Sequence, residues 1–351
     1  MQAEVFVNQL IKWYQTQKRE LPWRGIADPY KIWLSEIILQ QTRVNQGLPY
    51  YLRFTAAYPT VQDLANANEA EVLRLWQGLG YYSRARNLHA CAKMVVNEYN
   101  GSFPDSFDEL LKLKGIGRYT AAAIASLAFN KANAVVDGNV YRVLSRVFGI
   151  TNDISEAKTQ KVFEAKANSM IPADQPGDFN QALMDFGATH CTPKKPLCIT
   201  CPFQAECFAF NKGMIDQLPV KTKKVKVRKR YFYYLLFEHK GKLLMKERGP
   251  KDIWQGLNDF HLIEEKKPIA VESVLAKVDL QGITVGGISE PVKHILTHQQ
   301  IFAQFIRLEV KEMNKFVALS NDLELKSFSL KAIHDLPKPV LVNNYLKENL
   351  F

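Results

Sequence analysis

The spacing of apolar residues changes once along this chain of 351 residues, and that change limits the folds available to it. Up to about residue 210, apolar side chains recur with the period of amphipathic helices, interrupted by Gly, Pro and Asn. From about residue 229, short β-rich runs such as 231–239 and 301–310 alternate with glycine-containing turns. The chain is long enough for two separate hydrophobic cores. We therefore predict a mainly helical region followed by a separate α+β domain.

A run of basic residues joins the two regions. Seven Lys and Arg residues fall between positions 221 and 230, with no acidic residue among them. Like charges repel one another and remain hydrated, so this run is typical of an exposed connector. We predict a helical domain at 1–212, a basic linker at 213–229 and the α+β domain at 230–351.

Composition excludes several classes of protein. Apolar residues make up 47% of the chain and charged residues 23%, which is typical of a globular protein rather than a disordered one. No apolar stretch is long enough for a membrane span. The N-terminal segment resembles an amphipathic helix more than it resembles a signal peptide, because Phe6, Leu10, Trp13 and Tyr14 fall on one side of it. We therefore expect a cytoplasmic protein. The formal charge of +11 favours a polyanionic partner, although solubility alone is an alternative explanation.

Four of the five cysteines fall within seventeen residues, as Cys191-x6-Cys198-x2-Cys201-x5-Cys207. In a reducing compartment such a cluster is typical of a metal site rather than of disulfides. Four thiolates suit either zinc or an iron–sulfur cluster, and the ligand chemistry alone does not choose between them. Cys91 lies in an apolar helical run, and we expect it to be a small core residue.

Two glycines on either side of Ile116 join a short helix to an Ala-rich one. They allow a tight turn whose backbone N–H groups point outward at the start of the second helix, where they can bind a phosphate. A plain helical turn is the alternative. In a basic, helical region we predict a helix-hairpin-helix whose contacts with the DNA backbone come from Lys114, Gly115, Gly117 and Arg118.

Two carboxylates are candidates for acid–base chemistry. Glu36 lies in the otherwise almost wholly apolar segment 32–39, where a carboxylate is either paired with a cation or has a raised pKa, as a general acid does. Asp137 lies at a helix start, where capping is the simpler explanation. Cleavage of a glycosidic bond requires one carboxyl group that donates a proton and a second that stays ionised. The pair therefore predicts glycosidic chemistry.

Taken together, these features resemble the adenine DNA glycosylases, a family of the endonuclease III superfamily. The matching strings span residues 1–210 in the family's order and are Leu21-Pro22-Trp23-Arg24, Ser35-Glu36 with Leu39-Gln40-Gln41-Thr42, Gly78-Leu79-Gly80-Tyr81-Tyr82, Gly115-Ile116-Gly117-Arg118, Val136-Asp137-Gly138-Asn139-Val140, Phe179-Asn180-Gln181-Ala182-Leu183 and the cysteine cluster. The resemblance implies a six-helix barrel with a helix-hairpin-helix and one [4Fe–4S] cluster bound by Cys191, Cys198, Cys201 and Cys207. It also implies a Nudix-like second domain.

The resemblance also implies residue roles. Glu36 would protonate N7 of an adenine turned out of the duplex, Asp137 would stabilise or trap the sugar cation, and Asn139 and Tyr119 would orient these carboxylates. The implied substrate contacts are Arg19, Arg24 and Gln181 at the adenine, Gln41 and Tyr81 as a wedge in the base stack, and Leu39 and Thr42 as further substrate-binding residues. Tyr119 stands where strand-nicking relatives have a Lys, and a phenol forms no Schiff base.

The second domain contains no Nudix box in 229–351, so we expect no phosphate-ester hydrolysis there. Leu296-Thr297-His298 resembles the family's Phe-Ser-His loop, which implies that Thr297 and His298 contact an 8-oxoguanine. Residues 256–260 depart from the family's pattern of an aromatic residue, an acid and Phe.

We therefore predict a monofunctional glycosylase of base excision repair that removes adenine opposite 8-oxoguanine or guanine and leaves an abasic site. Its partner would be double-stranded DNA containing A·8-oxoguanine or A·G mispairs. We expect a monomer associated with the nucleoid, with no membrane partner. The alternatives are a glycosylase for another mismatched base, such as thymine in G·T, and a non-catalytic protein that binds DNA damage.

Overall fold

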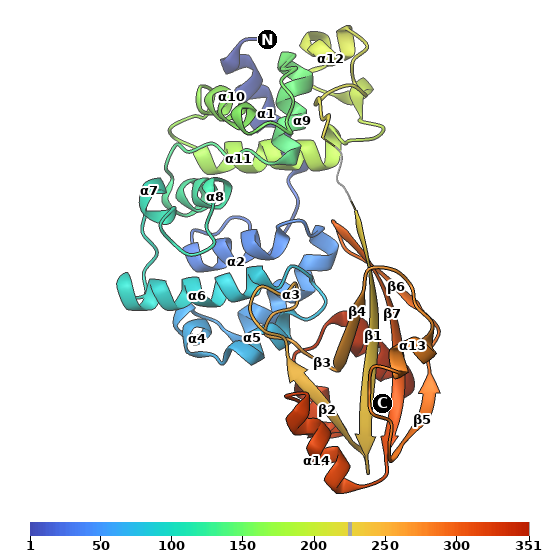
Figure 1. Ribbon diagram of the computed structural model, residues 1–351. Helices are drawn as coiled ribbons and strands as arrows, with labels where there is room; N and C mark the ends of the chain where they lie inside the picture. The colour runs from blue at the N-terminus through green and yellow to red at the C-terminus, as the bar shows by residue number, and fades with distance from the viewer. Residues whose placement is uncertain (224–226, 351) are drawn as a thin grey trace. The chain divides into compact units, whose positions relative to one another are not determined.

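A computed structural model describes residues 1–223 and 227–350, and these divide into two compact units (Figure 1). The first unit contains residues 1–66 and 87–223, and the second contains residues 67–86 and 227–350. Helices make up the regular structure of the first unit, and a mixed sheet with helices forms the second. The predicted change from helical to α+β structure is confirmed. The predicted linker residues 224–226 lie outside the described residues.

Helices of the first unit surround a shared apolar core. Their bounds are α1 (Ala3–Gln17), α2 (Pro29–Leu39), α3 (Val44–Ala57), α4 (Val61–Asn66), α6 (Ser83–Glu98, beginning in the second unit), α7 (Phe107–Leu110), α8 (Arg118–Phe129), α9 (Gly138–Phe148), α10 (Ala157–Asn168), α11 (Pro176–Asp185) and α12 (Phe208–Asn211). A π-helical turn at Phe186–His190 follows α11, and two 3-10 turns lie at Cys198–Thr200 and Gln204–Glu206. The Ala-rich α8 packs against both α2 and α11, because small side chains let helices approach closely.

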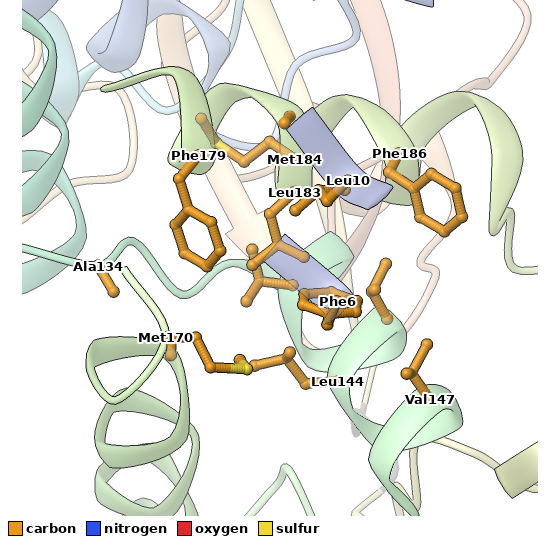
Figure 2. Close-up of a cluster of buried hydrophobic side chains, with 14 of the residues drawn as sticks. Phe6, Leu10, Ala134, Leu144, Val147, Met170, Phe179, Leu183, Met184 and Phe186 are labelled. Atoms are coloured by element: carbon orange, nitrogen blue, oxygen red, sulfur yellow. The ribbon is translucent and has the colours of Figure 1, made fainter. Parts of the chain in front are cut away.

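The N-terminal helix packs on α11, as its apolar stripe predicts (Figure 2). Phe6, Leu10 and Tyr14 are buried, and Trp13 packs partly buried against the same cluster. Phe6 contacts the ring of Phe203 at 4.7 Å between ring centroids, which brings α1 close to the loop that contains the cysteines. Burial of this stripe therefore fixes α1 against the chain's later helices.

A mixed eight-stranded sheet organises the second unit, with the main strand order β3-β2-β1-β7-β5. The strands are β1 (Arg228–His239), β2 (Lys242–Glu247), β3 (Asn258–Asp259), β4 (His261–Glu265), β5 (Ile283–Ile288), β6 (Val292–Ile295), β7 (Gln299–Val310) and β8 (Lys326–Ser329). β1 runs parallel to β7, and the other pairings are antiparallel. Residues 232–237 of β1 are all buried, because both faces of this central strand are covered.

Helices cover the sheet of the second unit. They are α13 (Val271–Leu275), α14 (Met313–Asp322), α15 (Leu330–Asp335) and α16 (Val340–Asn349). The earlier segment adds α5 (Glu69–Trp76) to this unit. The ring of Tyr345 in α16 stacks on Phe305 of β7, with 4.0 Å between centroids. Residues 67–86 are bound to the later part of the chain through Arg86, whose Nη1 donates to the Gln255 carbonyl at 2.7 Å.

None of the helices in residues 1–223 and 227–350 combines the length and the apolar character that a membrane crossing requires.

Candidate active site

Glu36 lies on α2 and is only 8% exposed. Burial raises the pKa of this carboxyl, and the negative charge of Asp137 raises it further, while a hydrogen bond from Tyr119 and the positive charge of Arg24 lower it in part. In the described parts of the chain no basic side chain forms an ion pair with Glu36, so the alternative of a structural ion pair is wrong. The raised pKa means that Glu36 keeps its proton to a higher pH than a solvated carboxyl does.

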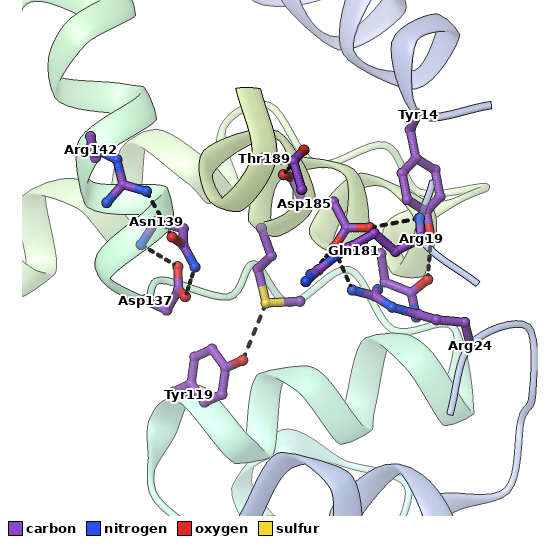
Figure 3. A network of polar contacts seen from close by, with 11 residues as sticks. Tyr14, Arg19, Arg24, Tyr119, Asp137, Asn139, Arg142, Gln181, Asp185 and Thr189 are labelled. Atoms are coloured by element: carbon purple, nitrogen blue, oxygen red, sulfur yellow. Dashed lines mark hydrogen bonds and ion pairs between the residues drawn. The ribbon is translucent and has the colours of Figure 1, made fainter. Parts of the chain in front are cut away.

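Asp137 is the N-cap of α9 (Figure 3). Its Oδ1 accepts hydrogen bonds from the backbone N–H groups of Asn139 and Val140, both at 2.8 Å, and its Oδ2 accepts one from Asn139 Nδ2 at 2.8 Å. Burial raises the pKa of Asp137, while these three donors lower it. The capping interpretation is therefore confirmed, and the cap geometry itself stabilises a carboxylate anion.

The two carboxyl groups interact, and their surroundings differ. Asp137 accepts three hydrogen bonds, whereas the Tyr119 hydroxyl, which donates to the Met184 sulfur at 3.2 Å, lies close enough to Glu36 to lower its pKa. Since hydrogen bonds to an anion favour its ionised form, the surroundings of Asp137 favour a carboxylate more than those of Glu36 do. Burial raises the pKa of Tyr119 far above its usual range, so this phenol stays neutral and can keep donating. The two carboxyl groups therefore differ in their hydrogen-bonding surroundings.

Three predicted adenine contacts meet at one place in the first unit (Figure 3). Arg24 Nη2 donates to Asp185 Oδ1 at 2.8 Å, and Arg19 Nε donates to the same oxygen at 3.1 Å. One helical turn earlier on α11, Gln181 Oε1 accepts a hydrogen bond from the Tyr14 hydroxyl at 2.6 Å. The structure therefore brings Arg19, Arg24 and Gln181 together.

Sequence reasoning missed Asp185, which is completely buried. The signal that could have found it is the one that singles out Glu36, a lone acidic residue within an apolar segment, here Leu183-Met184-Asp185-Phe186. Such a carboxylate needs a cationic partner or a proton.

Arg142 was also missed, and it links the active site to the cysteine loop. Its Nη2 donates to Asn139 Oδ1 at 2.8 Å and to the Gly187 carbonyl at 2.5 Å, while its Nε donates to the Cys191 carbonyl at 2.7 Å. Asn139 in turn donates to Asp137. The position of the Asp137 carboxylate therefore depends on the fold of the loop that begins at Cys191.

The four clustered cysteines are free thiols that lie close enough to influence one another. Burial raises the pKa of Cys201 to about 12, and the charges of Cys191, Cys207 and Cys198 also raise it. Four adjacent thiolates require compensating positive charge, and metal ions supply it. Arg146 adds a guanidinium whose Nη1 lies 3.5 Å from the Cys191 sulfur. The donor set fits a metal cluster bound by four thiolates.

Within the described residues no three His, Cys, Asp or Glu side chains are placed to bind a single metal ion. Four thiolates as a ligand set suit either zinc or an iron–sulfur cluster.

The hairpin between α7 and α8 has the backbone that the sequence predicts. Gly115 has a φ of +77°, and a Cβ at this position would lie 2.7 Å from the Cβ of Asn87, so only glycine fits. Gly117 is the N-cap of α8, and a Cβ there would meet no atom within 4 Å. Its open surroundings leave the first N–H groups of α8 accessible to a phosphate. Lys114 is exposed beside it.

Arg118 is already paired in the hairpin. Its Nη2 donates to Glu164 Oε2 at 2.9 Å, and its Nε donates to Glu164 Oε1 at 3.0 Å. A phosphate that binds Arg118 therefore competes with this carboxylate or joins it.

The predicted wedge residues both lie in left-handed backbone at exposed turns, in different units. Gln41 follows α2 with a φ of 56°, and its neighbours Leu39 and Thr42 close the turn through a backbone hydrogen bond of 3.0 Å. Tyr81 has a φ of 50° and is 41% exposed in the second unit. Non-glycine residues in this conformation are uncommon and project sharply from the turn.

Thr297 and His298 form the exposed turn between β6 and β7. The Thr297 hydroxyl is hydrogen-bonded to the Tyr81 hydroxyl, so residues far apart in sequence meet within the second unit. Around them lies a cavity of about 570 Å³. Its lining includes Tyr81, Thr297, His298, Trp254 and His294. A cavity of this size, lined by rings and hydroxyl groups, has the chemistry to contact a nucleobase.

The chain matches two family models. Residues 34–169 match the HhH-GPD superfamily of base excision DNA repair proteins, and residues 232–348 match the NUDIX domain. The helical region is therefore that of a helix-hairpin-helix DNA glycosylase, and the α+β region has the predicted Nudix-like fold.

Relatives identify the family. An adenine DNA glycosylase of Buchnera aphidicola subsp. Baizongia pistaciae is 34% identical over 90% of this chain and 89% of its own length. Another, from Buchnera aphidicola subsp. Acyrthosiphon pisum, is 35% identical over 76% of this chain and 77% of its own length. The chain belongs to the adenine DNA glycosylase family, as its motifs predict. Among solved structures, a thermostable thymine-DNA glycosylase is similar, with a TM-score of 0.56, 33% identity, and coverage of 60% of this chain and 97% of that one.

Proposed function

We propose that this protein is a monofunctional DNA glycosylase of base excision repair that releases adenine opposite 8-oxoguanine or guanine and leaves an abasic site. The observation that carries the proposal is the pairing of Glu36, a buried carboxyl with a raised pKa, with Asp137, a carboxylate held by three hydrogen bonds. A protein that only binds damage has no use for this pair.

In the proposed reaction Glu36 acts first as an acid and then as a base, while Asp137 remains a carboxylate. Protonated Glu36 donates to N7 of adenine, the bond between the sugar and the base breaks, and its electron pair leaves with the base. The ionised Asp137 stabilises the positive charge that develops on the sugar. A water then attacks the sugar carbon and gives its proton to the Glu36 carboxylate, which regenerates the acid. Tyr119 lies beside Glu36 and favours its ionised form after the proton has left.

The absence of strand cleavage follows from the chemistry of Tyr119. A lyase step begins with an amine that attacks the sugar, and a phenol with a strongly raised pKa neither forms a Schiff base nor ionises to act as a nucleophile. The product we propose is therefore an intact strand with an abasic site.

Selection of the opposite base is assigned to the second unit. Tyr81 projects from a strained turn beside the Thr297 hydroxyl, and both line the same cavity as His298. A hydroxyl and an imidazole can hydrogen-bond to the edge of an oxidised purine, and the tyrosine ring can stack on it. The alternative substrate, thymine in a G·T pair, has some support because a solved thymine-DNA glycosylase is similar to 60% of this chain, at 33% identity.

Single-turnover assays on duplexes test the proposal. The base under attack is A, G or T, placed opposite 8-oxoguanine or guanine, with product detected after alkali and without it. We expect A to be released opposite both purines, faster opposite 8-oxoguanine, with strand breaks only after alkali. Persistence of A opposite 8-oxoguanine contradicts the proposal, and breaks without alkali contradict its monofunctional part.

Replacing Thr297 by Val is expected to weaken discrimination between 8-oxoguanine and guanine. Valine keeps the shape of threonine but removes the hydroxyl, so one hydrogen bond to the lesion is lost and the preference falls about two- to tenfold. The ratio of the single-turnover rates on the two duplexes measures this change. Thr284→Val, at an exposed position of the same unit, is the matched control. An unchanged ratio in Thr297→Val contradicts the lesion contact.

We also propose that Cys191, Cys198, Cys201 and Cys207 hold one [4Fe–4S] cluster. When bound, the cluster supplies structural crosslinks and charge rather than a reacting group. The cysteine residues hold the loop that contains Lys194 and Lys195, and this loop presents its basic side chains to the DNA backbone. Arg146 donates to the Thr192 carbonyl at 2.8 Å and so supports the same loop.

Replacing Cys198 by Ser is expected to lower the bound iron and weaken DNA binding, because one of four ligands is lost. Iron content per chain and a fluorescence titration with duplex DNA measure the two effects. Cys91→Ala is the control, since Cys91 is buried and lies far along the chain from the four clustered cysteines. Full iron content in Cys198→Ser, or loss of iron in Cys91→Ala, contradicts this ligand assignment.

A further inference from the structure

Asp185 is a completely buried carboxylate that takes no part in the proposed proton transfers. It lies on α11, and its Oδ1 accepts hydrogen bonds from Arg24 Nη2 at 2.8 Å and Arg19 Nε at 3.1 Å (Figure 3). Its Oδ2 accepts from the Arg19 backbone N–H at 3.4 Å. One carboxylate therefore holds two guanidinium groups at the edge of the proposed adenine pocket.

Arg24 also acts on Glu36. The groups that influence Glu36 are Tyr119 from α8, Asp137 from the start of α9 and Arg24 from the segment before α2, whose positive charge favours the ionised form of Glu36. A direct ion pair between Arg24 and Glu36 would hold Glu36 ionised and leave it without the proton that it donates. The pocket thus contains a cation that can disable the general acid.

The remaining hydrogen-bonding capacity of Arg24 points to its use. Its Nε–H is buried and has no partner among the described residues, while Nη2 is bound to Asp185. A buried donor without a partner is costly unless a ligand satisfies it. The ring nitrogens of adenine are acceptors that suit such a donor.

We propose that Asp185 is a positioning residue that binds the guanidinium groups of Arg24 and Arg19, so that neither pairs with Glu36 and the Nε–H of Arg24 is left for the base. This inference rests on the proposed function, because it assigns Glu36 the role of proton donor. The physical reason is charge balance. Two arginines and one aspartate leave one net positive charge beside the pocket, and removal of the aspartate charge leaves two.

A purely structural role predicts a different result. If the Asp185 ion pairs only hold the segment of Arg19 and Arg24 on α11, their loss lowers stability and slows the reaction equally at every pH. A positioning role moves the pH at which the rate declines, because the uncompensated arginines favour ionised Glu36. The pH profile therefore separates the two roles.

The experiment compares Asp185→Asn with the wild-type full chain on a duplex containing A opposite 8-oxoguanine, in single turnover between pH 5 and pH 9. In the variant we expect the declining limb of the profile to move to lower pH. A displacement of one pH unit slows release about tenfold at pH 8 and leaves the rate at pH 5 close to wild type. Asp178→Asn, at an exposed position on the same helix, is the matched control and should leave the profile unchanged.

Arg19→Met supplies a second test in the opposite direction, and it keeps the inference testable if Asp185→Asn fails to fold. With Arg19 removed, Asp185 is available to Arg24 alone and one positive charge is lost, so the declining limb should move to higher pH. A uniform loss of rate with an unmoved limb in either variant overturns the inference. If the wild type releases no adenine at all, it is the proposed function that fails instead.

Discussion

Replacing Glu36 by Gln is expected to slow adenine release by about 10²–10⁴-fold, the contribution of a positioned general acid. Glutamine keeps the size and shape of the side chain but carries no transferable proton. The amide oxygen can interact with the Tyr119 hydroxyl as the carboxyl does, so the pocket keeps its geometry. Single-turnover rates on a duplex containing A opposite 8-oxoguanine measure the loss, and a DNA-binding titration shows whether substrate binding persists.

The same variant has a signature in stability. Burial raises the pKa of Glu36 above its unfolded value, so protonation favours the folded state, and this contribution is lost as the pH rises through the folded-state pKa. Glutamine stays neutral at every pH. We therefore expect the Tm of the variant to gain on that of the wild type as the pH rises from the unfolded-state pKa to the folded-state pKa of Glu36, and the difference to stay constant above it.

Wild-type activity should follow the same titration. The rate is expected to fall as the pH rises through the raised pKa of Glu36, because the proton donor is then lost. Glu4→Gln on α1, at an exposed position, is the matched control for both rate and Tm. Release of adenine by Glu36→Gln at the wild-type rate contradicts the acid role.

Replacing Asp137 by Asn is expected to slow adenine release by about 10²–10³-fold while leaving the fold intact, because the loss is that of a charge aimed at the reacting sugar. Asparagine caps helices about as well as aspartate, so the N–H groups of Asn139 and Val140 keep an acceptor. The free energy of unfolding should therefore change by less than about 1 kcal/mol. Denaturant melts and single-turnover rates, measured on the same preparation, test both parts.

Asp153→Asn is the matched control for this prediction. Asp153 also accepts a hydrogen bond from a backbone N–H two residues later, that of Ser155 at 2.8 Å, but it lies in a half-buried loop outside the catalytic pair. Its variant should retain the wild-type rate. An Asp137→Asn protein that keeps wild-type activity limits Asp137 to helix capping, and one that unfolds shows that the carboxylate charge also stabilises the fold.

Much of the architecture was predictable because its signals are local. The helical period and the glycines around Ile116 predicted the helical region and its hairpin, and alternating β-rich runs predicted the sheet. Glu36 and Asp137 were candidates because a lone carboxylate in an apolar segment and an acid at a helix start are visible in a few neighbouring residues. In each case the physical cause lies within about two helical turns of chain.

Long-range polar partners were not predictable in this way. Asp185 and Arg142 are buried, and their partners lie 166 and 49 residues away at Arg19 and Cys191. A sequence shows that a buried charge needs a partner, but many opposite charges along the chain could serve. The contact between Tyr81 and Thr297, which are 216 residues apart, has the same origin. It follows from the packing of residues 67–86 with the rest of the second unit.

The amino-acid sequence by itself determined the two kinds of secondary structure, the hairpin, the four clustered thiols and the two carboxylates proposed as acid and anion. Only the tertiary structure decided how these carboxylates differ, because the pKa of each depends on the burial and the hydrogen-bond donors that distant helices bring to it. The tertiary structure also decided which charged side chains pair with one another, such as Asp185 with Arg24. Electrostatic energy depends on distance in space, and sequence separation does not report that distance.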